Sequence, residues 1–305
     1  MAIPSKTLEI RYSKIYNNYV NEDIKIASIS DVHISNAITT NDIDYIIETV
    51  KKESPNYICT LGDMIDYPRI LDNELNRLKC KRLYAGLSKI APVYIIFGNH
   101  DFINYDHKDK YLENFNEDFW NDLSTIKNIN IINDKKVILK DVIISGYLEK
   151  RNIYQDKTED TFYNDYSSIK DLKVNNSSKP KIIIMHSPEP FEDPRNIELV
   201  NNYNIVLCGH YHNGCVPAFL NKVMPKNSGI ITPTKKVLPK NVRGIRKISN
   251  NTFLIYNGGW TKIPNNTPKP IHVLDKICNR QIDITILTKN ISKEIEIKTK
   301  KIKMR

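Results

Sequence analysis

Residues 24–33 read Ile-Lys-Ile-Ala-Ser-Ile-Ser-Asp-Val-His, a short apolar run that ends in two polar side chains. A run of this length, rich in isoleucine, is typical of a buried β-strand. Asp31 and His33 follow it, and because alternate residues of an extended chain face the same side, these two side chains can bind the same ligand. Apolar strands that run into polar clusters recur along the chain, and this repetition decides the predicted fold.

Two further strands of the same character are predicted at residues 57–61 and 93–97. A helix that Thr40 or Asn41 caps, and that ends at Ser54, separates the first strand from the second. A leucine-rich helix separates the second strand from the third. Strands that alternate with helices in this way predict right-handed crossovers and a largely parallel sheet.

The second half of the chain supplies the rest of a predicted two-sheet α/β fold. The elements are an antiparallel group over 129–133, 136–139 and 142–145, strands at 181–185, 205–208 and 252–256, a helix near 196–202 and an edge strand around 291–297. Residues 149–168 are polar and aromatic without a clear period, which favours a loop or a lid. No linker interrupts this order. Residues 1–305 are therefore predicted to be one domain, with a basic irregular excursion at about 213–250.

The composition is that of a globular protein, because 40% of the 305 residues are apolar and 26% are charged. No run of 18 apolar residues occurs, and the first residues lack the apolar core of a secretory signal, so we expect neither a membrane span nor export. The five cysteines include no C-x-x-C pair, which suits a reducing compartment. A cytoplasmic location is the resulting expectation.

Each predicted buried strand is followed by a polar cluster, and open α/β sheets bind ligands at the carboxyl ends of their strands. The clusters are Asp31-Val-His33, Gly62-Asp63-Met-Ile-Asp66, Gly98-Asn99-His100-Asp101, Met185-His186 and Gly209-His210-Tyr-His212. Together they contain five of the seven histidines. A single Asp-x-His is a weak signal, but five clusters at five strand ends predict one site. Its carboxylates and imidazoles suit Mn²⁺, Fe or Zn²⁺.

In this order the clusters resemble the calcineurin-like metallophosphoesterase superfamily, and the resemblance extends over roughly residues 24–260. It implies a four-layer αββα sandwich of two mixed sheets, with two divalent metal ions at its centre. The ligands implied for one ion are Asp31, His33, Asp63 and His212, and those for the other are Asp63, Asn99, His186 and His210. The activity implied is hydrolysis of a phosphodiester, or also of a phosphomonoester, by a hydroxide that bridges the ions.

The resemblance also implies that His100 is the catalytic histidine. It adjoins a metal ligand, and its usual pKa of about 6.5 suits a general acid that protonates a leaving alkoxide. Asp101 is the predicted catalytic partner that orients it. A neutral amide at Asn99 agrees with the charge of the site. Two divalent ions together with Asp31, Asp63 and a hydroxide have a net charge of +1, and this positive charge would attract a phosphoryl group.

The positive charge of the chain is concentrated in one segment. The net charge of the chain is +10. The stretch from Leu199 to Leu274 contains ten lysines and arginines but no Asp or Glu, so the charge of this stretch alone equals the net charge of the chain. We expect this segment to face an anionic phosphate ester, with Lys235, Lys236 and Arg243 as substrate-binding residues. Its apolar side chains also fit peripheral contact with anionic lipid, although a loop that covers the sheet is favoured.

Several alternatives stay open at this point. The protein phosphatase branch of the superfamily has Arg-Gly where this chain continues with Tyr67, so the compact bacterial phosphodiesterase subgroup is the better match. That subgroup commonly has Gly-Gly-Gln where this chain has Asn213-Gly214-Cys215. A nuclease is favoured by the basic segment but lacks a nucleic-acid-binding motif. A pyrophosphatase acting on lipid phosphates or nucleotide sugars is a further alternative, and a non-catalytic scaffold would have lost metal ligands.

Overall fold

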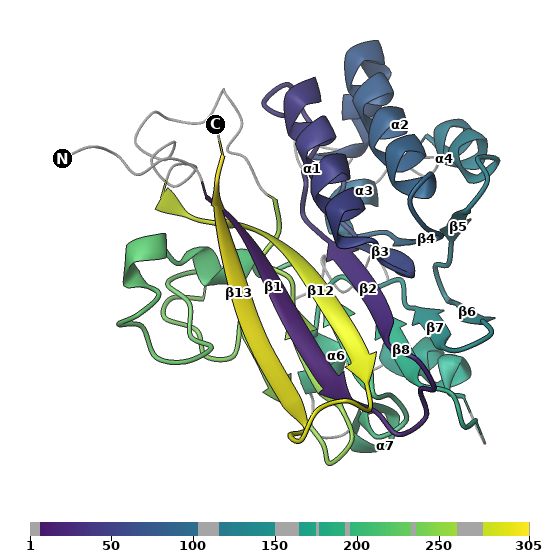
Figure 1. The fold of residues 1–305 in the computed structure, drawn as a ribbon. Helices are drawn as coiled ribbons and strands as arrows, with labels where there is room; N and C mark the ends of the chain where they lie inside the picture. Colours follow the sequence, from purple (N-terminus) through teal and green to yellow (C-terminus); the bar gives the residue numbers. More distant parts are fainter. Residues whose placement is uncertain are drawn as a thin grey trace.

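The computed structural model describes residues 7–102, 116–149, 165–174, 177–192, 196–232, 236–260 and 277–304. Most of the loop or lid predicted at 149–168 lies outside these residues. The strands form two sheets, one of seven strands and one of six. Figure 1 shows the long helices gathered on one side of the larger sheet.

The larger sheet contains the predicted β-α-β-α-β unit at its centre. In spatial order its strands are β13 (Ile295–Lys303), β1 (Thr7–Tyr16), β12 (Arg280–Thr288), β2 (Ile24–Ile29), β3 (Tyr57–Leu61), β4 (Val93–Ile96) and β5 (Ile129–Ile131). β2 to β5 are parallel, and β12 runs antiparallel to β2. β13 pairs with β1 at one edge, in agreement with the predicted edge strand.

The smaller sheet is parallel in its middle and antiparallel at both edges. Its strands, in spatial order, are β10 (Gly244–Lys247), β11 (Phe253–Tyr256), β9 (Ile205–Cys208), β8 (Lys181–Ile184), β7 (Ile143–Gly146) and β6 (Lys135–Ile138). β11, β9, β8 and β7 are parallel to one another, whereas the edge strands β10 and β6 are antiparallel to β11 and β7. The carboxyl ends of β8 and β9 therefore lie at the same edge of this sheet.

The three long helices are α1 (Thr40–Glu53), α2 (Glu74–Ser88) and α4 (Glu117–Ser124). Shorter ones are η1 (Pro68–Asp72), α3 (Asn99–Phe102), η3 (Asp165–Leu172), α6 (Glu189–Glu192), α7 (Ile197–Val200), η5 (His212–Cys215) and η6 (Ala218–Leu220). α1 is capped by Thr39, one residue before the predicted cap, because the Thr39 hydroxyl accepts the Asp42 N–H while the Asp42 carboxylate accepts the Thr39 N–H. No helix in the described part of the chain combines the length and apolar character needed to cross a bilayer.

Three apolar cores separate the layers of the molecule. α1, α2 and α4 pack on one face of the larger sheet, and the other face of that sheet packs against the smaller sheet. Side chains alternate along β8, so that Ile182 and Ile184 join the core between the sheets whereas Ile183 packs outward against Phe191 and Leu199. The order helices, sheet, sheet, helices confirms the predicted four-layer αββα fold.

Three features differ from the predictions. β5 does not belong to an antiparallel group with β6 and β7, because it pairs in parallel with β4 in the other sheet. The basic excursion is not irregular throughout, since β10 lies within it and pairs with β11. β1 and β12 were not predicted. Each carries charged residues inside the strand, and these become buried only when Arg11 and Asp283 pair at 2.7 Å.

Candidate metal centre

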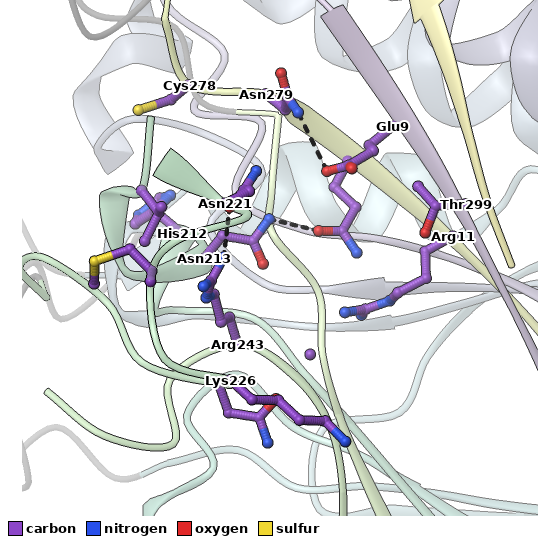
Figure 2. Close-up of a pocket in the computed structure, with 15 residues that line it drawn as sticks. Glu9, Arg11, His212, Asn213, Asn221, Lys226, Arg243, Cys278, Asn279 and Thr299 are labelled. Atoms are coloured by element: carbon purple, nitrogen blue, oxygen red, sulfur yellow. Dashed lines mark hydrogen bonds between the residues drawn. The ribbon is translucent and has the colours of Figure 1, made fainter. Parts of the chain in front are cut away.

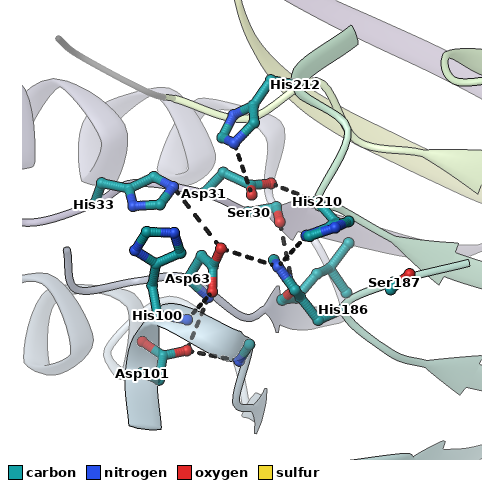
Figure 3. Close-up of polar contacts among 12 residues, drawn as sticks. Ser30, Asp31, His33, Asp63, His100, Asp101, His186, Ser187, His210 and His212 are labelled. Atoms are coloured by element: carbon teal, nitrogen blue, oxygen red, sulfur yellow. Dashed lines mark hydrogen bonds and ion pairs between the residues drawn. The ribbon is translucent and has the colours of Figure 1, made fainter. Parts of the chain in front are cut away.

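The polar clusters meet where the carboxyl ends of the two sheets face each other. The loops after β2, β3 and β4 bring Asp31, His33, Asp63, Asn99 and His100 from the larger sheet. The loops after β8 and β9 bring His186, His210 and His212 from the smaller one. Figure 3 shows the aspartates and histidines of this set directed toward a common centre, with Asp63 in the middle. The structure thus brings together six of the seven residues predicted as metal ligands, and the seventh, Asn99, precedes His100 in α3.

Three groups of described side chains are compact enough to hold a metal ion, and one of them consists of His33, Asp66 and His100. The other two consist only of predicted metal ligands. In one of these two groups ligand atoms of Asp31, His33 and His212 lie within 4.8 Å of one another, and His212 Nε2 is 3.6 Å from Asp31 Oδ1. The other group contains Asp63, His186 and His210. Asp63 Oδ2 lies 2.9 Å from His186 Nε2 and 3.9 Å from His33 Nε2, so this carboxylate adjoins both groups.

His186 has the hydrogen bond expected of a metal-binding histidine. Its Nδ1 lies 2.8 Å from the carbonyl oxygen of Leu61, which can only accept, so Nδ1 carries a proton. Its Nε2 faces Asp63 and lies 3.1 Å from His210 Nδ1. A backbone carbonyl that fixes the tautomer and aims the other ring nitrogen is the usual support of such a ligand.

The electrostatics of the site favour a positive charge next to the carboxylate of Asp63. Burial by itself would raise the pKa of this carboxyl, but His186 and the other histidines hold it well below the usual value. Burial would lower the pKa of His186, yet the charge and hydrogen bond of Asp63 raise it to about 10. Burial lowers the pKa of His212 to about 4 and that of His210 well below its usual value. The last two are therefore neutral imidazoles, the form that binds metals.

His100 is held at the side of this centre by Asp66. Its Nδ1 lies 2.6 Å from the Asp66 carbonyl oxygen, and its backbone N–H donates to Asp63 Oδ1 at 2.8 Å. The ring stands edge-on to that of His33, with 4.6 Å between the ring centres. Burial lowers the pKa of His100, while the charge of Asp63 opposes that shift. Because Nδ1 is bound to a carbonyl, Nε2 is the nitrogen available for proton transfer.

The side chain of Asp101 hydrogen-bonds to the backbone of the loops that carry the predicted ligands, and its orienting role toward His100 stays a prediction. Its Oδ2 accepts the N–H groups of Asp63 and Gly98 at 2.8 Å each, and its Oδ1 accepts those of Met64 and Ile65. Burial and the charge of Asp63 raise the pKa of Asp101 to about 7. The carboxylate therefore ties the loop after β3 to the loop after β4. The carbonyl that orients His100 belongs to Asp66. A contact made by a backbone carbonyl does not depend on the residue type, so the sequence could not predict it.

The backbone of the site is locally strained. Asp31, His33, Asp63, His210 and His212 all have positive φ angles between 45° and 69°, a region that side chains disfavour. Such conformations persist where the surrounding structure enforces them, and they gather at functional sites. Gly209 allows the close approach of the two sheets, because a Cβ there would lie 2.6 Å from Asp31 Oδ2.

The three predicted substrate-binding residues have different surroundings. Lys235 lies outside the described residues. Lys236 is exposed, and its charge acts on Glu189 and Glu192 of α6. Arg243 lines a cavity beside His212. The positive charge of the stretch from Leu199 to Leu274 is thus partly neutralised by acidic side chains from other parts of the chain.

Two ion pairs illustrate this neutralisation. Arg246 pairs with Glu192 at 2.7 Å, and Lys247 pairs with Glu294 at 2.6 Å. Sequence reasoning missed Arg11 and Lys226, which line the same cavity as Arg243. Arg11 precedes the first motif by 20 positions, so no motif spacing could have signalled it.

Residues 24–214 match the model of a family described as calcineurin-like phosphoesterase. The chain is similar to an uncharacterized metallophosphoesterase of Helicobacter pylori, at 24% identity over 212 residues, which are 69% of this chain and 50% of that protein. It is similar to an uncharacterized metallophosphoesterase of Campylobacter jejuni, at 24% identity over 216 residues, 70% of this chain and 51% of that protein. The chain spans about half the length of these curated relatives.

Among solved structures, a dimetal phosphatase from Danio rerio aligns with a TM-score of 0.43 and 11% sequence identity. The alignment covers 79% of this chain and 89% of that one.

Proposed function

The chain belongs to the calcineurin-like phosphoesterase family, and from that premise we propose that it is a phosphodiesterase that depends on two divalent metal ions. The observation that carries the proposal is the meeting of two ligand groups at Asp63. Its Oδ2 lies 2.9 Å from His186 Nε2 and 3.9 Å from His33 Nε2, so one carboxylate adjoins both groups. A shared carboxylate is a common feature of paired metal sites.

The donor atoms of this chain fit divalent cations. Asp31 and Asp63 are almost fully buried, and burial of a carboxylate costs free energy unless hydrogen bonds or a nearby positive charge compensate it. His33 Nε2 has no hydrogen-bond partner among the described residues although it faces the centre. We assign Asp31, His33, Asp63 and His212 to one ion, and Asp63, Asn99, His186 and His210 to the other. Bound Mn²⁺, Fe or Zn²⁺ supplies Lewis acidity and lowers the pKa of water.

His100 is proposed as the general acid. The Asp66 carbonyl fixes its Nδ1 proton, so a second proton on Nε2 is the one that can be given to a leaving alkoxide. The contact with His33 and the hydrogen bond from the His100 amide to Asp63 keep the ring beside the metal ligands. Asp66 is a positioning residue in this scheme, and Asp101 supports the loops on which both lie.

A cavity beside His212 supports a diester as the substrate. Its volume of about 390 Å³ is large enough for an alcohol group on the second side of the phosphorus. A phosphomonoester has no such group and would leave this space to water. The nuclease and the pyrophosphatase of lipid phosphates or nucleotide sugars are alternatives that use the same centre with another alcohol or phosphate in the cavity.

The metal requirement is tested by removing and restoring the ions. Protein stripped by a chelator is reloaded with Mn²⁺, Zn²⁺ or Fe²⁺ and assayed on bis(p-nitrophenyl) phosphate and p-nitrophenyl phosphate. We expect activity to return with at least one metal and to be higher on the diester. Asp63→Asn should abolish it, whereas Asp72→Asn, at an exposed aspartate, should not. Activity that survives both chelation and Asp63→Asn would contradict the proposal.

The role of His100 is tested by the leaving group. His100→Asn should keep its metals, measured by elemental analysis, and lose turnover most on diesters with poor leaving groups such as methoxide. Nitrophenolate needs little protonation, so its release should fall least. An equal loss for good and poor leaving groups would rule out the general acid.

Competing functions predict different substrates. A nuclease would cleave single- or double-stranded DNA or RNA faster than bis(p-nitrophenyl) phosphate, and a pyrophosphatase would prefer a nucleotide sugar. A non-catalytic scaffold would hydrolyse none of these compounds.

A further inference from the structure

The cavity beside His212 has a polar and largely cationic lining. Strands β1 and β12 contribute Glu9, Arg11 and Gln281, and the basic excursion contributes Asn221, Lys226 and Arg243 (Figure 2). His212 belongs both to this lining and to the candidate metal centre, where its Nε2 lies 3.6 Å from Asp31. A substrate bound at the metals can therefore extend past His212 into the cavity.

Arg243 and Lys226 present positive charge at the cavity wall, where the charge of Glu9 acts on Arg243. Arg243 Nη1 donates to Asn221 Oδ1 at 2.5 Å, and Nη2 donates to the Pro225 carbonyl at 3.4 Å, so neutral groups hold the guanidinium. Its Nε has no hydrogen-bond partner in the described part of the chain. Neither Arg243 nor Lys226 forms an ion pair with a described carboxylate. Cations left in this state at a cavity wall favour an anionic ligand.

Arg11 adds a third, buried cation. Its side chain is only 8% exposed, yet it lines the cavity. Both of its hydrogen bonds use Nη2, which donates to the Tyr256 carbonyl at 2.6 Å and to Asp283 Oδ2 at 2.7 Å. Its Nε has no partner among the residues that the structure describes. The guanidinium is thus fixed through Nη2, and its charge is paired with that of Asp283.

The remaining lining combines one acid with neutral amides. Glu9 lies 3.4 Å from Lys301, accepts a hydrogen bond at 3.3 Å from Asn279, which also lines the cavity, and acts through its charge on Arg243. Asn213 donates to Gln281 at 2.5 Å, and both side chains line the space. Amides exchange hydrogen bonds readily with hydroxyl groups. The lining therefore suits a polar group that ends in a negative charge.

We propose that this cavity binds the part of the substrate beyond the scissile phosphate, and that this part is a hydroxyl-bearing group that carries a second phosphate or a similar anion. The inference rests on the proposed function, because it takes the metal centre to be the place of reaction. Arg243 and Lys226 bind the distal anion, Arg11 supports it, and the amides contact the hydroxyl-bearing group.

A matched pair of substrates tests this inference. The p-nitrophenyl ester of thymidine 5′-phosphate and its 3′-phosphorylated form release the same leaving group and differ only in one distal phosphate. For the wild type, kcat/KM should be about ten-fold or more higher for the 3′-phosphorylated ester, because charge-assisted hydrogen bonds are worth about 1.5–3 kcal/mol. The ratio should fall toward one in Arg243→Gln and Lys226→Gln. It should persist in Lys240→Gln, an exposed lysine of the same segment outside the cavity.

The outcomes separate this inference from the proposed function. Hydrolysis of both esters with equal kcat/KM, or an equal fall of the ratio in Lys240→Gln, overturns the inference and leaves the phosphodiesterase intact. If neither ester is hydrolysed, the proposed function fails. Calorimetric titration with thymidine 3′-phosphate then tests whether the cavity binds the distal anion. Binding that weakens ten-fold or more in Arg243→Gln but not in Lys240→Gln supports the cavity, and any other titration result overturns it.

Discussion

At the scale of single residues, the carboxylate of Asp101 fixes the loops that carry the proposed metal ligands. Each of its oxygens accepts two backbone N–H groups. Asparagine has the same shape but replaces one oxygen by an NH₂ group, which would face two donors. We expect Asp101→Asn to lower the free energy of unfolding by about 2–6 kcal/mol, since each buried donor without a partner costs about 1–3 kcal/mol. Urea denaturation measures this loss.

A matched exchange on the surface calibrates that result. Asp72→Asn should change the free energy of unfolding by about 0.5 kcal/mol or less. If Asp101→Asn were as stable as Asp72→Asn but lost activity mainly on poor leaving groups, Asp101 would orient His100.

Glu149 provides a pH-dependent test at the residue scale. It is buried, its Oε1 accepts the Ser187 N–H at 2.5 Å, and burial raises its pKa to about 8. A carboxyl whose folded pKa lies above the unfolded value of about 4.3 contributes most below that value, and the contribution is lost as the pH rises to about 8. Glu149→Gln should therefore gain stability relative to wild type by up to about 1.4 kcal/mol per pH unit in this window.

The measurement is denaturation at pH 5 and pH 8 in the presence of a chelator, so that bound metal does not alter the charge balance. Glu198→Gln, at an exposed side chain, serves as the control and should show the same difference at both pH values. A difference between Glu149→Gln and wild type that does not grow with pH would mean that Glu149 is ionised in the folded protein.

At the scale of elements, the turn after β9 controls how closely the two sheets approach. A methyl group at Gly209 would lie 2.6 Å from Asp31 Oδ2 and would also overlap the Ser30 hydroxyl. Gly209→Ala should therefore displace Asp31 and weaken Mn²⁺ binding about ten-fold or more, as is usual when the support of a ligand is disturbed. Calorimetric titration with Mn²⁺ measures the affinity.

Gly86→Ala is the matched control for this substitution. Its methyl group would meet the flexible end of Ile47 in the contact between α2 and α1, away from the metal ligands. It should bind Mn²⁺ as wild type does. If Gly209→Ala bound the metal equally well, the close approach of the sheets would not position Asp31.

The elements also explain which parts of the fold could be predicted from the sequence. Strands β2, β3, β4, β8 and β9 are short apolar runs, so local pattern identifies them and places the polar clusters at their ends. Local pattern does not identify β1 and β12, because these strands contain charged residues whose burial depends on a partner in another part of the chain. Arg11 meets Tyr256 and Asp283, which lie 245 and 272 positions away. Local pattern contains no information about such pairs, and for the same reason it missed the cavity that Arg11 lines.

At the scale of the whole molecule, the basic segment presents exposed apolar side chains. Phe219 and Val223 are 67% and 74% exposed, so they do not cover the sheet as was favoured from the sequence. Exposed apolar groups among lysines fit the surface of an anionic membrane, which is the peripheral lipid contact expected from the sequence. The protein should cosediment with vesicles containing phosphatidylglycerol but not with purely zwitterionic ones.

Phe219→Ser combined with Val223→Ser should reduce this cosedimentation several-fold, because each side chain would lose about 1–3 kcal/mol of burial. Leu75→Ser combined with Leu78→Ser replaces two exposed leucines of α2 and serves as the control. Equal loss in both pairs, or no binding to anionic vesicles by the wild type, would contradict a membrane contact through the basic segment.

Bound metal ions should stabilise the whole molecule, because their proposed ligands come from both sheets. Asp31 and Asp63 follow strands of the larger sheet, whereas His186 and His212 follow strands of the smaller one. A ligand that binds only the folded state adds about 2.7 kcal/mol at one hundred times its Kd, so saturating Mn²⁺ should raise the Tm by roughly 5 °C or more. Asp63→Asn should lose most of this shift, and Asp72→Asn should retain it. An equal shift in Asp63→Asn, measured by calorimetry, would mean that manganese stabilises the protein at some other place and that the two sheets are not joined through this carboxylate.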